Sequence, residues 1–327
     1  MNVLRSVILA GLAIVAPGWF AGFAGFAADV AAPSSMPSLV IQTAAADSAL
    51  QSTLNRCVAA ELARPRTNAW SAGQLAVSLV DLAPGPPVRA SVRGSELVYP
   101  ASVVKLFYLA AAEQWLEEGR LTDSAELQRA LRDMIVDSSN DATHYVLDLL
   151  TGTTSGPELA PEALRSWVEQ RNAVNRWIAT LGYPAGINAN KKPWSDGPYG
   201  REKQAIDAFQ PNRNLLTTDA TARLLTEIAL GRIVTAVRCG RMRARLSRDP
   251  WAAPTAEDQI TGFIANGLPR GAKLWSKAGW TSETRHDAAL IELPSGRRVV
   301  LVIFTTGHAT EEDLLPSLTR SLLAALP

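Results

Sequence analysis

Ser102 and Lys105 stand three residues apart at the start of a long apolar, alanine-rich run. In a helix that begins near Ser102, residues i and i+3 lie side by side on one face. A serine hydroxyl becomes a nucleophile when an adjacent base takes its proton, and a lysine serves as that base if burial lowers its pKa. The pair therefore predicts covalent acyl transfer. For an isolated S-x-x-K motif, the alternative is an N-capping serine followed by a solvated lysine.

Two further polar groups lie at element boundaries where they could complete such a site. Ser138 and Asn140 belong to a polar loop between two apolar helical patterns, and Lys277 and Gly279 lie on a predicted strand near the end of the chain. The alternatives are that Ser138 and Asn140 only cap the next helix and that Lys277 is a solvated strand residue.

In this order the three groups resemble the S-x-x-K, S-D-N and K-T-G motifs of class A β-lactamases and penicillin-binding proteins, the serine penicillin-recognising enzymes. The resemblance extends over about residues 47–326. It implies that Ser102 is the acylated nucleophile, that Lys105 takes its proton, and that Ser138 relays a proton to the leaving nitrogen. Asn140 would bind the amide side chain of the substrate, and Lys277 would supply positive charge for its carboxylate.

The same resemblance places an oxyanion hole at the backbone N–H groups of Ser102 and Trp280, beside Gly279. Ala278 departs from the family pattern, because a Thr or Ser usually stands there and contributes a hydroxyl to carboxylate binding. Arg285 could compensate with its guanidinium, or it is a plain surface arginine.

The long segment 182–216 has almost no helical or strand periodicity and lacks the E-x-x-L-N motif of the family, whose glutamate activates the deacylating water. Glu202 is the only glutamate in this segment and is the candidate for that base. Because Arg201 and Lys203 flank it, ion pairs that hold the loop are the alternative. If Glu202 is not the base, the protein would be acylated and turn over slowly, and so bind penicillins rather than destroy them.

Composition excludes several other classes of function. The net charge of +1 gives no electrostatic footprint for nucleic acid or an anionic membrane. Two cysteines and three scattered histidines, without C-x-x-C or H-E-x-x-H, predict neither a metal site nor a cofactor. Cys57 and Cys239 are expected either to pair or to be free buried thiols.

Residues 1–27 combine one basic residue, a broken apolar stretch and small residues, which predicts a cleaved secretory signal peptide. We therefore expect a periplasmic or secreted protein, a flexible lead-in over 28–46 and a catalytic domain over 47–327. A membrane anchor is the alternative for the apolar stretch.

Hydrophobic periodicity predicts the fold class as α+β. We expect helices over 47–63, 102–116, 124–136, 142–150, 163–181, 220–230, 234–246, 258–264 and 311–326, and strands over 74–82, 88–92, 273–277, 287–293 and 298–306. Strands from both chain ends should form one antiparallel sheet flanked by helices, with a helical lobe over about 102–265 and the active site between them.

The sequence thus predicts a monomeric serine hydrolase of the class A β-lactamase type that acts on small β-lactam or related acyl substrates. The alternatives are a penicillin-binding D-alanyl-D-alanine peptidase or esterase-like relative, and a binding module without chemistry. A Ser-His-Asp hydrolase is disfavoured, since no G-x-S-x-G occurs and the neighbours His286 and Asp287 must face opposite sides of a strand.

Overall fold

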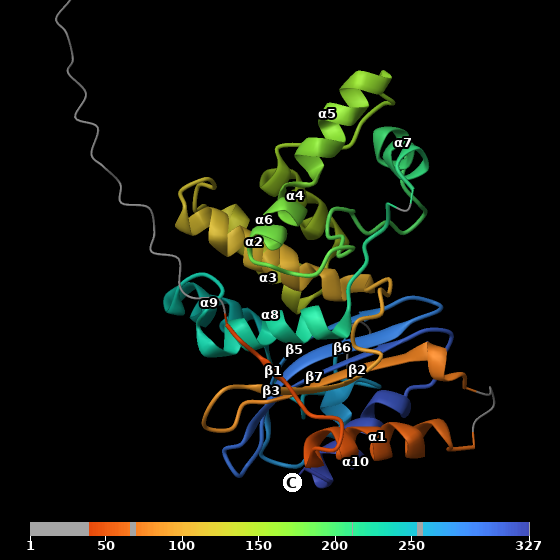
Figure 1. The fold of residues 1–327 in the computed structure, drawn as a ribbon. Helices are drawn as coiled ribbons and strands as arrows, with labels where there is room; N and C mark the ends of the chain where they lie inside the picture. Colours follow the sequence, from red (N-terminus) through yellow and green to blue (C-terminus); the bar gives the residue numbers. More distant parts are fainter. Residues whose placement is uncertain (1–38, 66–69, 211, 254–257, 327) are drawn as a thin grey trace, which may run out of the picture. The chain divides into compact units, whose positions relative to one another are not determined.

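One seven-stranded sheet joins the two ends of the chain (Figure 1). The computed structural model describes residues 39–65, 70–210, 212–253 and 258–326. In sheet order, the strands are β1 (Gln42–Thr43), β3 (Val88–Val92), β2 (Leu75–Asp81), β7 (Arg298–Thr305), β6 (Arg285–Glu292), β5 (Lys273–Trp280) and β4 (Ser247–Arg248). Neighbouring strands are antiparallel except β1 and β3, which pair in parallel. The predicted α+β class and the union of strands from both chain ends are confirmed.

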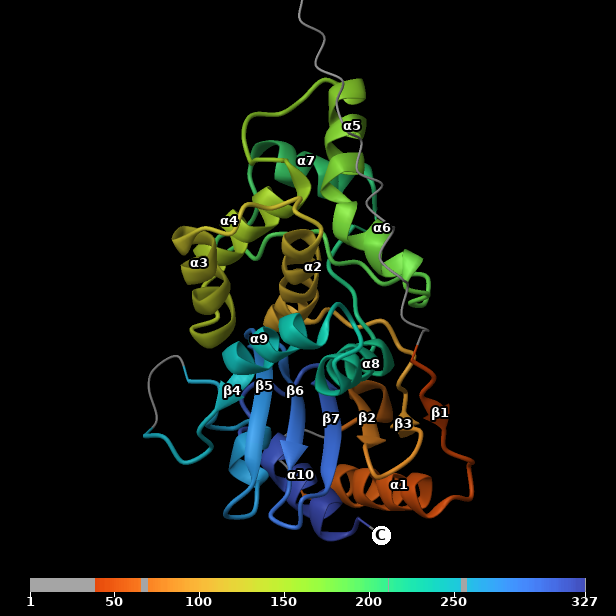
Figure 2. The ribbon, with the colours of Figure 1, turned by 90° about the vertical axis from the view of Figure 1, so that its left-hand side faces the viewer.

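The central strands are buried on both faces, because helices cover both sides of the sheet. The helices α1 (Ala49–Leu62) and α10 (Leu314–Ala324) pack on one face, around a core that includes Leu54, Leu79 and Leu318. On the other face, α8 (Thr218–Leu230) contacts β2, β6 and β7. Figure 2 shows this layering, with α8 and α10 on opposite sides of the strands.

The middle of the chain forms a helical lobe on the α8 side of the sheet (Figures 1 and 2). Its central helix α2 is hydrophobic around most of its circumference and almost wholly buried, as predicted for a core helix. The helices are α2 (Lys105–Glu117), α3 (Ala125–Val136), α4 (Asn140–Thr151), α5 (Pro161–Arg171), α6 (Ala173–Thr180), α7 (Gly200–Ala208) and α9 (Ala236–Leu246).

Several expected boundaries differ from the structure. The helix expected over 163–181 is broken at Asn172 into α5 and α6, and the segment 182–216 contains the helix α7. The helix expected over 258–264 is absent, and a short 3-10 turn, η3 (Ile264–Gly267), follows instead. Strand β1 lies within the expected flexible lead-in, where Gln42 pairs with Val88. Short polar segments of this kind carry too little periodicity to be assigned from sequence.

The remaining expectations concern the chain ends and the cysteines. Cys57 and Cys239 are free and buried, which agrees with the unpaired alternative. The predicted signal peptide, residues 1–27, lies outside the described residues. Of the helices in the described ranges, none has the length and hydropathy needed to cross a membrane.

Candidate active site

Ser102 lies in a tight 3-10 turn, η2 (Ala101–Val104), that leads directly into α2. Ala101 has φ of 45°, a left-handed conformation that costs a non-glycine residue about 1 to 3 kcal/mol and is concentrated at functional sites. The Ser102 side chain is partly exposed, and its hydroxyl has no hydrogen-bond partner among the described residues. The nucleophile predicted from the sequence is therefore accessible and uncommitted.

Lys105 opens α2 and is fully buried. Its Nζ donates to the carbonyl oxygen of Ser138 at 2.5 Å, to the Ser138 Oγ at 3.2 Å and to Asn140 Oδ1 at 2.9 Å. Desolvation disfavours the charged ammonium and lowers the pKa of Lys105 to about 7. A substantial fraction of this amine is consequently neutral near pH 7, as a general base requires. The solvated-lysine alternative is wrong.

Ser138 precedes α4 and has a strained φ of 55°. The N-cap of α4 is the next residue, Ser139, whose Oγ accepts a hydrogen bond from the N–H of Ala142 at 3.1 Å. The Ser138 hydroxyl is thereby free for the site, where it meets both Lys105 and Lys277.

Lys277 reaches the same hydroxyl from β5. Its Nζ lies 3.0 Å from Ser138 Oγ, 2.6 Å from Gln259 Oε1 and 2.6 Å from the carbonyl oxygen of Ala278. Burial first, and then the charges of Lys105 and Arg248, hold the pKa of Lys277 well below its usual range. Two ammonium groups that share one small acceptor repel each other. This geometry therefore favours the state in which only one of the two amines is protonated to the ammonium form.

The two lysine contacts determine which hydrogen bond the Ser138 hydroxyl can still make. A serine oxygen has two lone pairs and one O–H donor. When both lysines donate to Ser138 Oγ, its two lone pairs are occupied, and only the O–H donor remains. The Ser138 hydroxyl thus keeps its own proton for donation to another group.

Gly279 brings β5 against the start of η2. A Cβ at this position would lie 2.7 Å from Ser102 N, 2.8 Å from Val103 N and 3.0 Å from Pro100 O. Only glycine allows this approach of two backbones. The N–H of Ala278 bonds to the Gln259 side chain at the edge of β5 away from β6, so the two-residue repeat of a strand directs the Trp280 N–H to the same edge. Ser102 and Trp280 can therefore supply the two backbone donors of an oxyanion hole.

Four of the predicted site residues, Asn140, Trp280, Arg285 and Glu202, lie at its margin or beyond it. Asn140 is exposed and holds Lys105. The Trp280 ring lies on the opposite face of the sheet from Lys277 and contacts Phe263 at 5.6 Å between ring centroids, so only its backbone belongs to the site.

Arg285 also lies on the face of the sheet opposite Lys277. Lys277 pairs with Ala288, and Arg285 stands three positions before Ala288 on β6. Its Nε donates to the carbonyl oxygen of Ala309 at 2.8 Å, and its guanidinium lies over the Phe263 ring. The structure thus places Arg285 away from Lys277, so its guanidinium does not replace the hydroxyl that Ala278 lacks.

Glu202 lies in the first turn of α7, inside the helical lobe, and is almost fully buried. Its Oε1 accepts hydrogen bonds from Arg171 at 2.7 Å and from Ser155 at 2.9 Å, and Lys192 Nζ lies 3.7 Å away. No contact joins it to Ser102 or to either site lysine within the described chain. The geometry thus supports the alternative of a structural ion pair, although its partners are not the flanking residues Arg201 and Lys203 that the sequence suggested.

The structure adds Gln259, which the sequence did not indicate. Gln259 is buried and bridges β5 to the end of α3, since its Nε2 donates to the carbonyl oxygens of Ile135 and Val136 while its Oε1 accepts from Lys277. Arg248 reinforces the same junction by donating to these two carbonyl oxygens. Neither residue belongs to a motif, so no signal in the sequence singles them out.

Comparisons with known proteins show to which family the chain belongs. The model of the family described as "Beta-lactamase enzyme family" matches residues 59–326. No curated protein gives a significant match. Among solved structures, a β-lactamase from Sphaerobacter thermophilus is 21% identical with a TM-score of 0.58, and covers 84% of this chain and 98% of its own.

Two more structures share the fold. PBP-A is 17% identical with a TM-score of 0.57 (88% and 98% covered), and a β-lactamase from Chitinophaga pinensis is 16% identical with a TM-score of 0.59 (85% and 98% covered). At these identities the likeness concerns the fold alone, whereas the family match spans most of the chain. The chain therefore belongs to the β-lactamase enzyme family and is a β-lactamase-like serine hydrolase.

Proposed function

We propose that the protein is acylated on Ser102 by β-lactams or related cyclic amides and esters, and that it releases the acyl group slowly. The observation that carries this proposal is the convergence of Lys105 and Lys277 on the Ser138 hydroxyl, next to an uncommitted Ser102. A mutant of PBP-A, which shares the fold, is described as an acyl-enzyme complex with penicillin-G.

Acylation would proceed through the residues of this cluster. The neutral amine of Lys105 takes the proton from Ser102, whose Oγ bonds to the carbonyl carbon of the substrate. The N–H groups of Ser102 and Trp280 stabilise the negative charge on the carbonyl oxygen. As the C–N bond breaks, the Ser138 hydroxyl gives its proton to the leaving nitrogen and recovers one from the ammonium of Lys105.

The fate of the acyl group distinguishes this proposal from a class A hydrolase. Fast hydrolysis needs a base that activates water on the acylated serine. Glu202, the candidate from the sequence, is held by Arg171 and Ser155 within the helical lobe. This placement favours the penicillin-binding peptidase or esterase-like alternative over rapid destruction of β-lactams.

We further propose that the mature enzyme acts in the periplasm or outside the cell as a monomer. Signal cleavage after about residue 27 would leave a single catalytic domain over 47–327. Its partners are small acyl compounds, and the mechanism uses neither a cofactor nor a metal.

The experiment is to incubate the purified mature protein with penicillin G and follow its intact mass over time. We expect an adduct with the full mass of the penicillin that persists for many minutes, and no adduct for Ser102→Ala. The control Ser166→Ala, on the exposed side of α5, should label like the wild type. Absence of an adduct and of hydrolysis would overturn the proposal, and rapid release of the ring-opened product would favour the class A hydrolase.

A further inference from the structure

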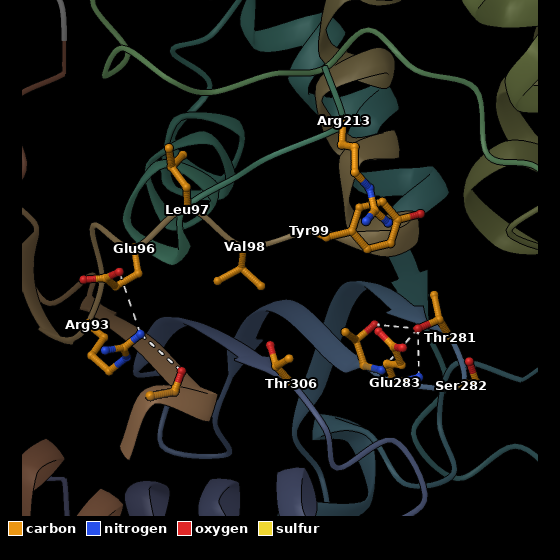
Figure 3. Close-up of a pocket in the computed structure, with 12 residues that line it drawn as sticks. Arg93, Glu96, Leu97, Val98, Tyr99, Arg213, Thr281, Ser282, Glu283 and Thr306 are labelled. Atoms are coloured by element: carbon orange, nitrogen blue, oxygen red, sulfur yellow. Dashed lines mark hydrogen bonds and ion pairs between the residues drawn. The ribbon is translucent and has the colours of Figure 1, made fainter. Parts of the chain in front are cut away.

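A cavity of about 480 Å³ opens beyond the end of β5, where Thr281 and its neighbours form part of its wall (Figure 3). Its walls include Tyr99 and Arg213 on one side and Thr281, Glu283 and Thr306 on the other. Tyr99 stands three residues before Ser102, and Thr281 directly follows Trp280. Residues of the cavity wall therefore lie close in sequence to both proposed backbone donors of the oxyanion hole, Ser102 and Trp280.

In the proposed acylation, one part of the substrate is left to extend into this cavity. Around the acyl carbon, the oxyanion faces the N–H groups of Ser102 and Trp280, and the leaving nitrogen faces Ser138. The remaining substituent, the acyl side chain, must extend away from Ser138, and so toward the end of β5. His286 supports this wall, because its Nε2 lies 2.9 Å from the carbonyl oxygen of Tyr99.

Two exposed charged side chains of the cavity wall, Arg213 and Glu283, have no partner of opposite charge among the described residues. Arg213 lies over the Tyr99 ring at 4.8 Å, and no carboxylate pairs with it among the described residues. Glu283 uses its backbone N–H and carbonyl in turn contacts, but its carboxylate has no cationic partner within the described ranges. By contrast, Arg93 and Glu96 at the far end of the cavity face each other at 3.7 Å.

We propose that this cavity binds the acyl side chain of the substrate and selects a zwitterionic end, an ammonium beside a carboxylate as in an amino acid. Arg213, held by the Tyr99 ring, receives the carboxylate, and Glu283 receives the ammonium. The hydroxyl of Thr306 lines the same cavity and adds a polar contact for this group, whereas the Thr281 hydroxyl is held by Glu283 N, Thr284 N and the Thr284 hydroxyl. This inference rests on the proposed acylation of Ser102 and names the class of substrate, a peptide-like acyl donor with a free amino acid end.

The test uses three penicillins that differ only in the side chain: phenylacetyl, adipoyl and α-aminoadipoyl, which are apolar, anionic and zwitterionic at the distal end. The rate of acylation of Ser102 is measured by intact mass at several concentrations of each. For the wild type we expect the zwitterionic compound to acylate fastest, about tenfold faster than the apolar one, as one charge-assisted contact allows.

Substitutions separate the two charges. Arg213→Gln should slow both compounds that carry the distal carboxylate about tenfold and leave the phenylacetyl compound unchanged. Glu283→Gln should remove the advantage of the aminoadipoyl over the adipoyl side chain. Arg270→Gln is the matched control, because Arg270 lies over the ring of Trp251 in the same manner, away from the cavity, and should change none of the rates.

The outcomes distinguish this inference from the proposed function. Equal acylation of the wild type by all three compounds would overturn the selectivity and leave the acylation of Ser102 intact. An equal loss for all three compounds in Arg213→Gln would overturn the binding role of Arg213 in favour of a structural one. No acylation by any compound would overturn the proposed function, and this inference with it.

Discussion

The contact between Gly279 and the start of η2 yields a quantitative prediction for Gly279→Ala. The added methyl carbon would lie 2.7 Å from the nitrogen of Ser102, and three backbone atoms surround it within 3.0 Å. The strand and the turn would have to separate by about 0.7 Å to reach ordinary van der Waals contact. Neither can yield through a side-chain rotation, since all three neighbours are backbone atoms.

Such a shift is large on the scale of oxyanion stabilisation. Effective donors lie about 2.7 to 3.1 Å from the position of the oxyanion, and loss of one donor lowers the rate about 10²- to 10³-fold. We therefore expect Gly279→Ala to slow acylation of Ser102 by about 10²-fold or more. Overpacking at a buried site should also lower the free energy of unfolding by about 1 to 3 kcal/mol.

The assay is single-turnover acylation by a chromogenic penicillin, with thermal unfolding measured on the same samples. Gly240→Ala is the matched control, because Gly240 lies within α9 and a Cβ there would meet no atom within 4 Å. The control should acylate normally and gain about 0.5 to 1 kcal/mol of stability, because alanine favours a helix. Normal acylation by a folded Gly279→Ala protein would refute the placement of the oxyanion hole at this contact.

Three further predictions concern the groups around this contact. The acylation rate should rise with pH through about 7, because deprotonation of Lys105 creates the base; a flat profile between about pH 6 and 8 would contradict this role. Glu202→Gln should lower the free energy of unfolding by about 1 to 3 kcal/mol, measured by denaturant titration, because Arg171 loses the nearer of its two carboxylate partners and keeps only Asp148. The lifetime of the acyl-enzyme should stay the same, and a longer lifetime would restore Glu202 as the base. Gln259→Ala should slow acylation about tenfold in the same single-turnover assay, because Lys277 and the Ala278 N–H lose their common acceptor, and an unchanged rate would exclude that positioning role.

The sequence was sufficient for the parts of the site that depend on local pattern. Ser102 and Lys105 are predicted from one helical turn, and their surroundings from the apolar run that follows. Ser138 and Lys277 are predicted because each lies where a regular element meets a polar segment, and the structure brings both to Lys105. The fold followed from strong periodicity in the long helices and in the final strands.

Two features explain the residues that the sequence did not place correctly: the face of the strand on which a side chain lies, and the contacts that form only in the folded protein. Arg285 is near Lys277 in sequence, yet an odd offset across the β5–β6 register puts it on the other face of the sheet. Glu202 was chosen from its distance to the next helix, but its location depends on α7, in a segment with weak periodicity. Gln259 owes its role to three-dimensional contacts alone, with Lys277 on one side and Val136 on the other.

The hydrogen bonds of Lys277 also bear on how a substrate carboxylate is recognised. An ammonium group has three donors, and those of Lys277 are taken by Ser138, Gln259 and the carbonyl of Ala278. To bind a carboxylate directly, Lys277 would have to give up one of these contacts, and Ala278 supplies no hydroxyl in its place. Lys277 is therefore better suited to orient Ser138 than to read a carboxylate, so the charge that discriminates among substrates is expected on the acyl side, at Arg213.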